Sequence, residues 1–220
     1  NIGTPLRTQR FTIRWADTLD RLNALGAETL MTEFGQLVEG AETVHMVLAN
    51  MSEALRWCRE QVVDRMNRGM GESEILHDID FPAELFEKPW MLPIYGDPTY
   101  IVRDLFREEN GWWDRNPTTL HPSAQAEAAD AVLSAIGDPS AVVVKAKQLR
   151  DAGQVQLALH VIDLVALADG EDPVVAQARE LKAELCRLRA KEVTAFVSKS
   201  LYESSARLLE EGGTSWTGIN

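Results

Sequence analysis

The second half of the chain carries the pattern that restricts its fold most strongly. Residues 123–210 are rich in Ala and Leu, and helix-start signals recur in them. At Asp138 and at Asp172 a capping Asp stands directly before a Pro, which suits the first helical position. Glycines suited to helix ends are Gly137, Gly153 and Gly170. We therefore expect four or five antiparallel helices here, and a domain boundary near residue 122.

One pair of these helices resembles a tetratricopeptide-like hairpin. The hairpin spans residues 142–168 and is marked by Ala146, Gly153 and Ala158. A weaker hairpin follows from Pro173, and no clean repeat recurs at the roughly 34-residue period of such arrays. The predicted fold class is therefore mostly α, with tetratricopeptide-like helical hairpins rather than a solenoid.

The first half of the chain alternates helical stretches with irregular segments. Apolar residues recur at helical spacing in residues 11–25 and along residues 40–69, the longest candidate helix. Between them, residues 28–33 are expected to form a short buried strand. Shorter helices are expected at 72–77 and 98–109, separated by a proline-rich loop. The apolar positions of the first stretch are Ile13, Trp15, Leu19, Leu22 and Leu25.

Composition argues against several functional classes. The net charge is −12, from 34 acidic and 22 basic residues, and so acidic a chain repels the phosphates of nucleic acids. No apolar run approaches the ~20 residues that a membrane-spanning helix needs. Two cysteines, Cys58 and Cys186, do not make a disulfide framework or a zinc-binding cysteine cluster. We interpret both as small buried hydrophobes.

The histidines do not form a recognisable metal site. Glu42 and Glu74 each stand three residues before a histidine, His45 or His77, which can place both side chains on one helix face. Neither pair completes a ligand set, and such spacing is common by chance. A structural role is the simpler interpretation for all four histidines: His45, His77, His121 and His160.

No arrangement of nucleophile, base and oxyanion donor is visible either. Glu108–Glu109, near Arg103 and Arg107, is typical of a solvated helix face. The sequence has no Gly-x-Ser-x-Gly elbow, no phosphate-binding glycine loop and no Cys-x-x-Cys pair. The residues alone therefore indicate a helical packing or interaction domain.

The most distinctive local sequence is Gly111-Trp-Trp-Asp-Arg-Asn-Pro117. Its two adjacent tryptophans cannot point the same way, so we expect one to enter the core and the other to pack under the turn. Extended to Pro122, the motif resembles a signature of bacterial alkyl sulfatases with a metallo-β-lactamase fold, which runs Gly-Trp, Phe or Tyr, Asp-Gly-Asn-Pro and ends in Leu-His-Pro. The motif residues are Gly111, Trp112, Trp113, Asp114, Asn116 and Pro117.

The resemblance extends over nearly the whole chain. Tyr95-Gly96 stands where the family has a Tyr-Gly pair, and Met66–Gly69 matches its Asn-x-Gly turn. The domain organisation that it implies is the C-terminal end of a metallo-β-lactamase-like domain at 1–40, a long helix and connector with the motif at 41–122, and a helical dimerisation domain at 123–220.

In that family an upstream catalytic domain binds two zinc ions through a His-x-His-x-Asp-His motif and acidic residues, and the metals activate a water. This chain lacks that motif and begins at Asn1 rather than Met. The resemblance therefore implies that it supplies dimerisation and part of the substrate pocket of a longer hydrolase, with no zinc ligand and no catalytic residue of its own. Phe34 stands where a last histidine ligand is usual, and Gln36 also departs from the pattern.

Three positions match residues near the family's sulfate pocket. Asn1 and Arg7 are similar to an Asn and an Arg that contact sulfate, and Tyr95 to a tyrosine beside the same pocket. A planar guanidinium matches tetrahedral oxyanions, although a chain end, a surface charge and a packed tyrosine are the simpler alternatives. Arg115 replaces a glycine of the motif, which costs roughly 1 kcal/mol if the backbone there has positive φ.

Three interpretations remain open. The first is part of a zinc-dependent sulfuric-ester hydrolase that takes a small sulfate ester. The second is a non-catalytic helical dimerisation or interaction subunit that has lost metal binding, which Phe34 and Gln36 favour. The third is an unrelated tetratricopeptide-like adaptor that binds a peptide.

The first two interpretations imply a homodimer through apolar faces of the last helices. A charge at Leu157 or Leu164 is then expected to destabilise either the core or the dimer. The sequence determines neither the ester nor the compartment, since bacterial members of the family occur both inside the cell and exported.

Overall fold

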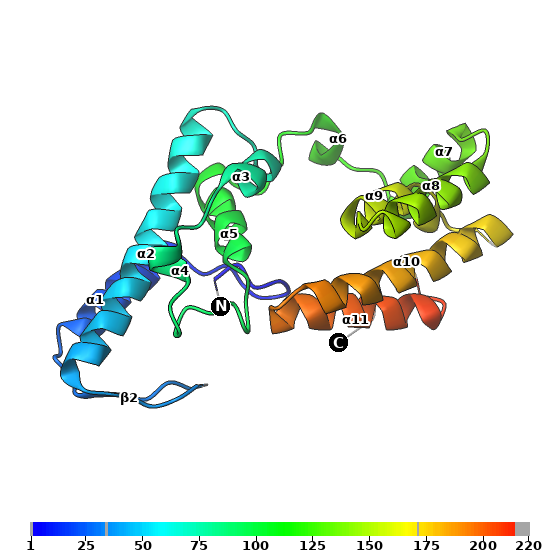
Figure 1. The fold of residues 1–220 in the computed structure, drawn as a ribbon. Coiled ribbons are helices and arrows are strands. Elements are labelled where there is room, and N and C mark those ends of the chain that lie inside the picture. The colour runs from blue at the N-terminus through cyan, green and yellow to red at the C-terminus, as the bar shows by residue number, and fades with distance from the viewer. Residues whose placement is uncertain (1, 34, 171, 214–220) are drawn as a thin grey trace. The chain divides into compact units, whose positions relative to one another are not determined.

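The computed structural model describes residues 2–33, 35–170 and 172–213. Two expected site positions, Asn1 and Phe34, lie outside the described residues. The chain forms two compact units, residues 1–119 and 120–220, each described by itself below. The helices are α1 (Thr12–Asn23), α2 (Ala41–Asn67), α3 (Glu72–Asp78), α4 (Ala83–Phe86), α5 (Pro98–Asn110), α6 (Pro117–Leu120), α7 (Gln125–Ala135), α8 (Pro139–Asp151), α9 (Val155–Ala166), α10 (Pro173–Glu192) and α11 (Phe196–Glu210). The fold is mostly α, as expected (Figure 1).

The long helix α2 organises the first unit. Its apolar stripe is buried along its length, so the expected helix over 40–69 is confirmed. One end of the stripe packs on α1 and the other on α3 and α5, which gives two neighbouring cores. The chain leaves α2 at Gly69, whose φ of 89° is a conformation that favours glycine. The buried α2 residues include Val44, Leu48, Leu55, Cys58 and Val62.

The helix α1 forms where expected but buries a different face. Its buried residues are Thr12, Ala16 and Leu19, whereas Trp15 and Leu25 of the apolar stripe are exposed. The predicted stripe was therefore only partly right, because the small Ala16 allows α1 to approach α2 closely. Ser52 of α2 donates a hydrogen bond of 3.3 Å to the Ala16 carbonyl at this contact.

The strand expected at 28–33 is much shorter and is not buried. Thr29–Leu30 forms β1, which pairs antiparallel with β2 (Val38–Glu39), with Thr29 opposite Glu39. Leu30 is only partly buried and Met31 is exposed. The sequence pattern missed β2, since a strand of two residues is too short for any periodicity.

The second unit contains the expected antiparallel helices. Within residues 125–210 the helices α7 to α11 pack in sequence order, most closely as α8 on α9, α9 on α10 and α10 on α11. Both Asp-Pro helix starts are confirmed: Asp138 accepts the Ser140 N–H at 3.0 Å, and Asp172 accepts the Val174 N–H at 2.9 Å. One core of small and branched side chains fills the unit.

The boundary between the compact units falls between residues 119 and 120, near the composition change around residue 122. Residues 1–40 and most of 41–122 belong to a single unit, because α1 and the N-terminal segment pack against α2 and α5. Leu157 and Leu164 of α9 are 51% and 45% exposed, so these two side chains are not part of the core.

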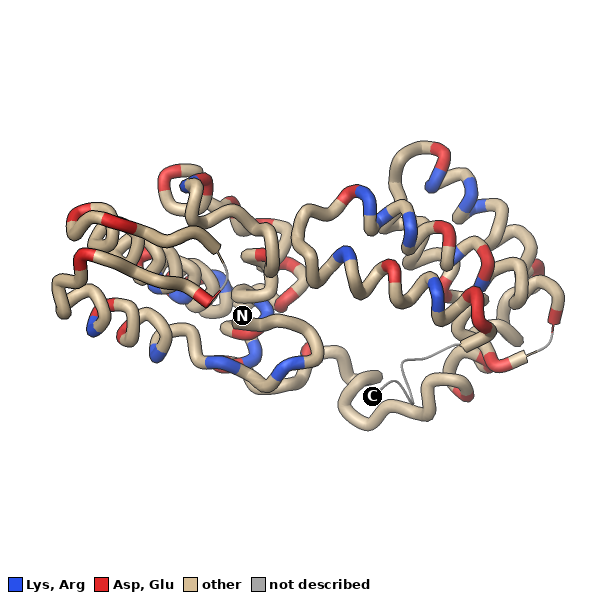
Figure 2. Tube along the Cα trace, turned by 90° about the horizontal axis from the view of Figure 1, so that it is seen from below, with Lys and Arg blue, Asp and Glu red and all other residues tan. Residues whose placement is uncertain are grey.

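Surface charge is mixed in both units. Along the described part of the chain, acidic and basic residues are interspersed on the helices of both units (Figure 2). Arginines are paired locally, as in Arg56 with Asp17 and Asp20. Within the described residues, no helix is both long enough and apolar enough to span a bilayer.

Adjacent valines of α8 give a test of the second core. Val143 is 2% exposed and Val144 is 53% exposed. Val143→Ala is expected to lower the free energy of unfolding by about 2 kcal/mol, because it removes buried methyl groups and leaves a cavity. Val144→Ala, the matched control, should change it by less than about 0.5 kcal/mol. Urea unfolding followed by far-UV circular dichroism measures both. Equal effects would contradict this assignment of the α8 face.

Candidate functional site

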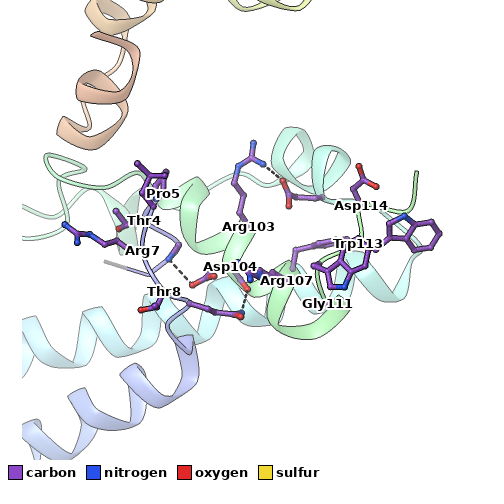
Figure 3. Close-up of a pocket in the computed structure, with 16 residues that line it drawn as sticks. Thr4, Pro5, Arg7, Thr8, Arg103, Asp104, Arg107, Gly111, Trp113 and Asp114 are labelled. Atoms are coloured by element: carbon purple, nitrogen blue, oxygen red, sulfur yellow. Dashed lines mark hydrogen bonds and ion pairs between the residues drawn. The ribbon is translucent and has the colours of Figure 1, made fainter. Parts of the chain in front are cut away.

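The first unit contains a cavity of about 350 Å³ between the N-terminal segment and α5. Residues 3–9 form one wall (Figure 3). The opposite wall consists of Glu72, the α5 residues Arg103, Asp104, Phe106 and Arg107, and the start of the motif at Gly111–Asp114. Arg7 and four motif residues, about a hundred positions away in the sequence, therefore line the same cavity.

The side chain of Asp104 holds the N-terminal segment on α5. Its Oδ2 atom accepts the backbone N–H groups of Gly3, at 3.0 Å, and of Arg10, at 3.3 Å. The Gln9 side chain also donates to the Asp104 carbonyl at 3.4 Å. Asp104 is only 6% exposed, and a buried carboxylate needs such donors to offset its lost hydration. Both ends of the loop at 3–10 are thus tied to one residue.

Two residues of this loop have left-handed backbone conformations. Gly3 has φ 68°, and a Cβ atom at this position would lie 1.9 Å from the Tyr100 carbonyl oxygen. Leu6 has φ 62°, which costs a non-glycine residue roughly 1–2 kcal/mol. Leu6 is also 79% exposed. Strain at an exposed residue beside a cavity is a feature of ligand-binding sites.

Only some of the charged side chains that line the cavity have partners. Arg103 forms an ion pair with Glu72, and Asp104 is occupied by the backbone donors of the loop. Within residues 2–33, 35–170 and 172–213, no acidic side chain pairs with Arg7 or Arg107. Figure 3 shows the Arg7 side chain extending away from Asp104 and α5. Arg7 and Arg107 are thus available to an anion.

The motif folds as a turn with its own hydrogen bonds. Asp114 Oδ1 accepts the Asn116 N–H at 2.9 Å and the Thr119 hydroxyl, and Asn116 Oδ1 accepts the Thr118 N–H at 3.1 Å. The hydrogen bonds from Thr119 and from the Asn116 backbone lower the pKa of Asp114. The carboxylate is therefore ionised at neutral pH and is directed into the turn.

The two tryptophans do not behave as expected. Trp113 packs on the turn and donates from Nε1 to the Asn116 carbonyl at 3.0 Å, as predicted for one of the pair. Trp112 is 69% exposed, so the expectation that one tryptophan enters the core was wrong. Gly111, at φ 80°, ends α5 and turns the chain outward, which places Trp112 at the cavity instead.

The expected strain at Arg115 is present, since its φ is 69°. Its guanidinium donates to Asn110 Oδ1 at 2.9 and 3.1 Å and to the carbonyls of Gly69 and Met70 at 3.3 and 3.4 Å. It also lies 5.5 Å from the centre of the Phe106 ring. These contacts offset the strain and join the motif to the end of α2.

The other expected site residues are placed differently. Tyr95 is exposed in the proline-rich segment and is not among the residues that line the cavity. Asp104 and Arg107 line the cavity, although Arg107 was interpreted from the sequence as part of a solvated face and Asp104 was not singled out. No local signal could have revealed Asp104, because its partners are 94 and 101 positions away.

Neither a metal centre nor a reactive cysteine is evident in the part of the chain that the structure describes. No three His, Cys, Asp or Glu side chains in it are grouped so as to hold a metal ion. His45 Nδ1 contacts Asn23 Oδ1 at 2.9 Å, and His77 Nδ1 contacts the Ser73 carbonyl at 2.6 Å. Burial raises the pKa of the Cys58 thiol to about 12, so this cysteine is not a thiolate nucleophile at neutral pH.

Comparison with known proteins gives a consistent result. The family model described as alkyl sulfatase dimerisation matches residues 71–212, which include α5, the motif and the helices of the second unit. A linear primary-alkylsulfatase from Pseudomonas sp. is 28% identical over 174 residues, covering 79% of this chain and 32% of that protein. An (R)-specific secondary-alkylsulfatase from Pseudomonas sp. is 25% identical, covering 90% of this chain and 30% of that protein. An alkyl/aryl-sulfatase from Saccharomyces cerevisiae is 24% identical, with coverages of 90% and 31%.

The chain thus spans about one third of the length of these relatives. Among solved structures, the stereoselective inverting sec-alkylsulfatase Pisa1 from Pseudomonas sp. is similar, with a TM-score of 0.84 and 23% identity. The similarity covers 97% of this chain and 35% of that chain. At this identity the likeness is one of fold.

The role of Asp104 can be tested directly. Asp104→Ala leaves the Gly3 and Arg10 N–H groups without their acceptor and is expected to lower the free energy of unfolding of the first unit by about 2–4 kcal/mol. Asp104→Asn keeps an acceptor oxygen and should lower this free energy of unfolding by about half as much. Tryptophan fluorescence during urea unfolding reports mainly on this unit, which contains five of the six tryptophans: Trp15, Trp57, Trp90, Trp112 and Trp113.

Asp64→Ala serves as the control, because Asp64 is an exposed partner of Arg68 on α2 and should contribute less than about 0.5 kcal/mol. If Asp104→Ala shifts the unfolding curve no further than Asp64→Ala, the carboxylate does not hold the segment.

Proposed function

Since the chain belongs to the alkyl sulfatase dimerisation family, we propose that it is the C-terminal part of an alkyl-sulfatase-like hydrolase with a metallo-β-lactamase fold. The observation that carries the proposal is the match over residues 71–212, which spans both the motif turn and the helical second unit. The relatives that support it are alkylsulfatases from Pseudomonas sp. and an alkyl/aryl-sulfatase from yeast. The proposed reaction is hydrolysis of a sulfuric ester. The unrelated peptide-binding adaptor is set aside by the family match.

We propose that the metal chemistry of such a hydrolase is supplied by residues other than those described here. The family resemblance implies a dinuclear zinc site upstream, but the described residues offer no group of three ligands and do not fit a zinc site. The proposal assigns no catalytic residue to this chain. Its proposed contributions are self-association and part of the wall of the substrate pocket.

Arg7 is the proposed contact to the sulfate group. It extends away from α5, lacks an acidic partner among the described residues, and lies on a loop that Asp104 anchors at both ends (Figure 3). A guanidinium held in this way can donate two parallel hydrogen bonds to a tetrahedral oxyanion without first breaking an ion pair. Asn1 and Tyr95 remain proposed substrate contacts on the family resemblance alone.

Self-association follows from the family, and the proposed assembly is a homodimer. The exposed face of α9 supports a role of the second unit in it. Leu157 and Leu164 are seven residues apart, so they lie on one side of the helix, and both are about half exposed although α9 packs into the core by its other side. Large apolar side chains on the open face of a core helix favour a protein partner.

A non-catalytic dimerisation subunit is the second candidate. Phe34 and Gln36 favour it, because they depart from the family's sequence at the expected position of its last histidine ligand. This candidate keeps the second-unit surface and gives no role to Arg7. The two candidates therefore differ in whether the native protein contains zinc and releases sulfate.

The hydrolase proposal predicts that the native polypeptide is much heavier than 24.5 kDa, contains bound zinc, and releases sulfate from dodecyl sulfate. In that protein, Arg7→Ala should lower kcat/KM by about 10²–10³, the range for removing one donor to a reacting oxyanion. Arg21→Ala on α1 is the matched control and should leave activity unchanged. Intact-mass spectrometry, metal analysis and sulfate release measure these outcomes. A native mass near 24.5 kDa without zinc would leave the non-catalytic candidate.

The α9 face predicts a separate result for assembly. Leu157→Glu and Leu164→Glu change exposed positions, so the fold should persist. Each places a charge in the dimer contact and should raise the dissociation constant of the dimer at least tenfold. Light scattering after size-exclusion chromatography gives the mass, and circular dichroism checks the fold. Lys145→Glu places a charge on α8 as the control. A dimer that is unaffected by both glutamates places the interface elsewhere.

A further inference from the structure

We propose that a groove along α2 binds a linear diammonium ion of the polyamine type, with one ammonium group at Glu53, the other at Glu60 and the methylene chain over Trp57. The groove is a cavity of about 400 Å³ between α1, α2 and α4. It shares no lining residue with the cavity beside Arg7, so this ligand is separate from the substrate of the proposed hydrolase.

Helical geometry places the three recognition residues on one side of α2. Trp57 follows Glu53 by four positions and precedes Glu60 by three, so the three side chains leave the helix within about 60° of one another. The seven positions from Glu53 to Glu60 span two turns, or roughly 10 Å along the helix axis. An extended chain of about eight carbons separates its two terminal nitrogens by a similar distance. A linear diammonium ion therefore matches both glutamates at once.

The charges in the groove favour a cation. One lining residue, Arg56, is basic, and the acidic ones are Asp20, Glu53 and Glu60. Arg56 is held by α1, because its Nη2 atom lies 2.7 Å from Asp17 Oδ1 and 2.6 Å from Asp20 Oδ2. Glu53 and Glu60 have no basic partner among the residues that the structure describes. Two carboxylates are therefore open to ammonium groups, and the net charge of −12 attracts cations to the chain.

The apolar part of the groove is held in place before a ligand arrives. The Trp57 ring lies 5.9 Å from the ring centre of Phe81 and 5.5 Å from that of Phe86. On the α4 side, the Asn50 side chain donates to the Leu85 carbonyl at 3.3 Å and ties α4 to α2. A methylene chain can therefore cover the indole without reordering either wall, and the ammonium groups at its ends gain from the indole face.

The size of the groove suits a small organic cation. Its volume lies within the range for small-molecule sites, about 300–1,000 Å³, whereas a folded partner needs a larger surface. A metal ion is a poorer match, since no three His, Cys, Asp or Glu side chains in the described part of the chain are grouped so as to hold one. The two separated carboxylates and the indole between them instead suit a ligand with two charges and an apolar middle.

Isothermal titration calorimetry of the 220-residue chain with 1,8-diaminooctane at low ionic strength tests the site. Saturable one-to-one binding is expected. Octan-1-amine keeps the chain but has one ammonium group, and 1,4-diaminobutane is too short to reach both glutamates. Each should have a Kd about three- to fivefold higher, as expected for the loss of one exposed ion pair. Equal Kd values for 1,8-diaminooctane and octan-1-amine would overturn the proposal.

Isosteric variants test the two carboxylates. Glu53→Gln and Glu60→Gln each remove one charge from an exposed position, so the fold should persist and the Kd for 1,8-diaminooctane should rise about three- to fivefold. The double variant should raise it about tenfold or more. Glu42→Gln is the matched control, because Glu42 is an exposed glutamate of α2 that does not line the groove. Circular dichroism checks the fold. If the double variant binds 1,8-diaminooctane as tightly as the parent chain does, the assignment is wrong.

Discussion

The carboxylate of Asp104 is the contact on which the arrangement of the first unit depends. It is almost fully buried, and the two backbone N–H groups that offset its lost hydration come from the ends of one loop. This geometry lets Gly3 approach the Tyr100 carbonyl, holds Leu6 in an unfavourable conformation and aims Arg7 away from α5. A helix that is otherwise part of the core thus becomes the base of a cavity.

The motif turn and the cavity illustrate two kinds of structural information in a sequence. Asp114, Asn116 and Thr119 bond to neighbours two to five residues away, so the turn is specified locally and is visible as a motif. The hydrogen bonds of Asp104 join residues about a hundred positions apart, and no sequence pattern near Asp104 predicts them. The more recognisable element is therefore the one whose folding requires the fewest distant contacts.

The same distinction separates what could be predicted from what could not. Capping chemistry predicted the helix starts at Asp138 and Asp172. The helical spacing of apolar residues predicted the whole of α2. The buried face of α1 could not be predicted in this way. The small Ala16 packs against α2, whereas Trp15 remains exposed. Of the residues that line the cavity, Arg7 and the motif were proposed through family resemblance. Arg107 was not singled out, because its place in the cavity wall depends on the fold and not on its sequence neighbours.

Arg115 shows how an unfavourable residue can become hard to replace. Its backbone conformation suits glycine, yet its side chain reaches Asn110 and the carbonyls after α2. A return to glycine would relieve the local frustration and at the same time release the end of α2 from the motif. The two effects oppose each other. Whether Arg115→Gly raises or lowers the free energy of unfolding therefore depends on what else stabilises the end of α2. Arg115 therefore couples the stability of the motif turn to that of the end of α2.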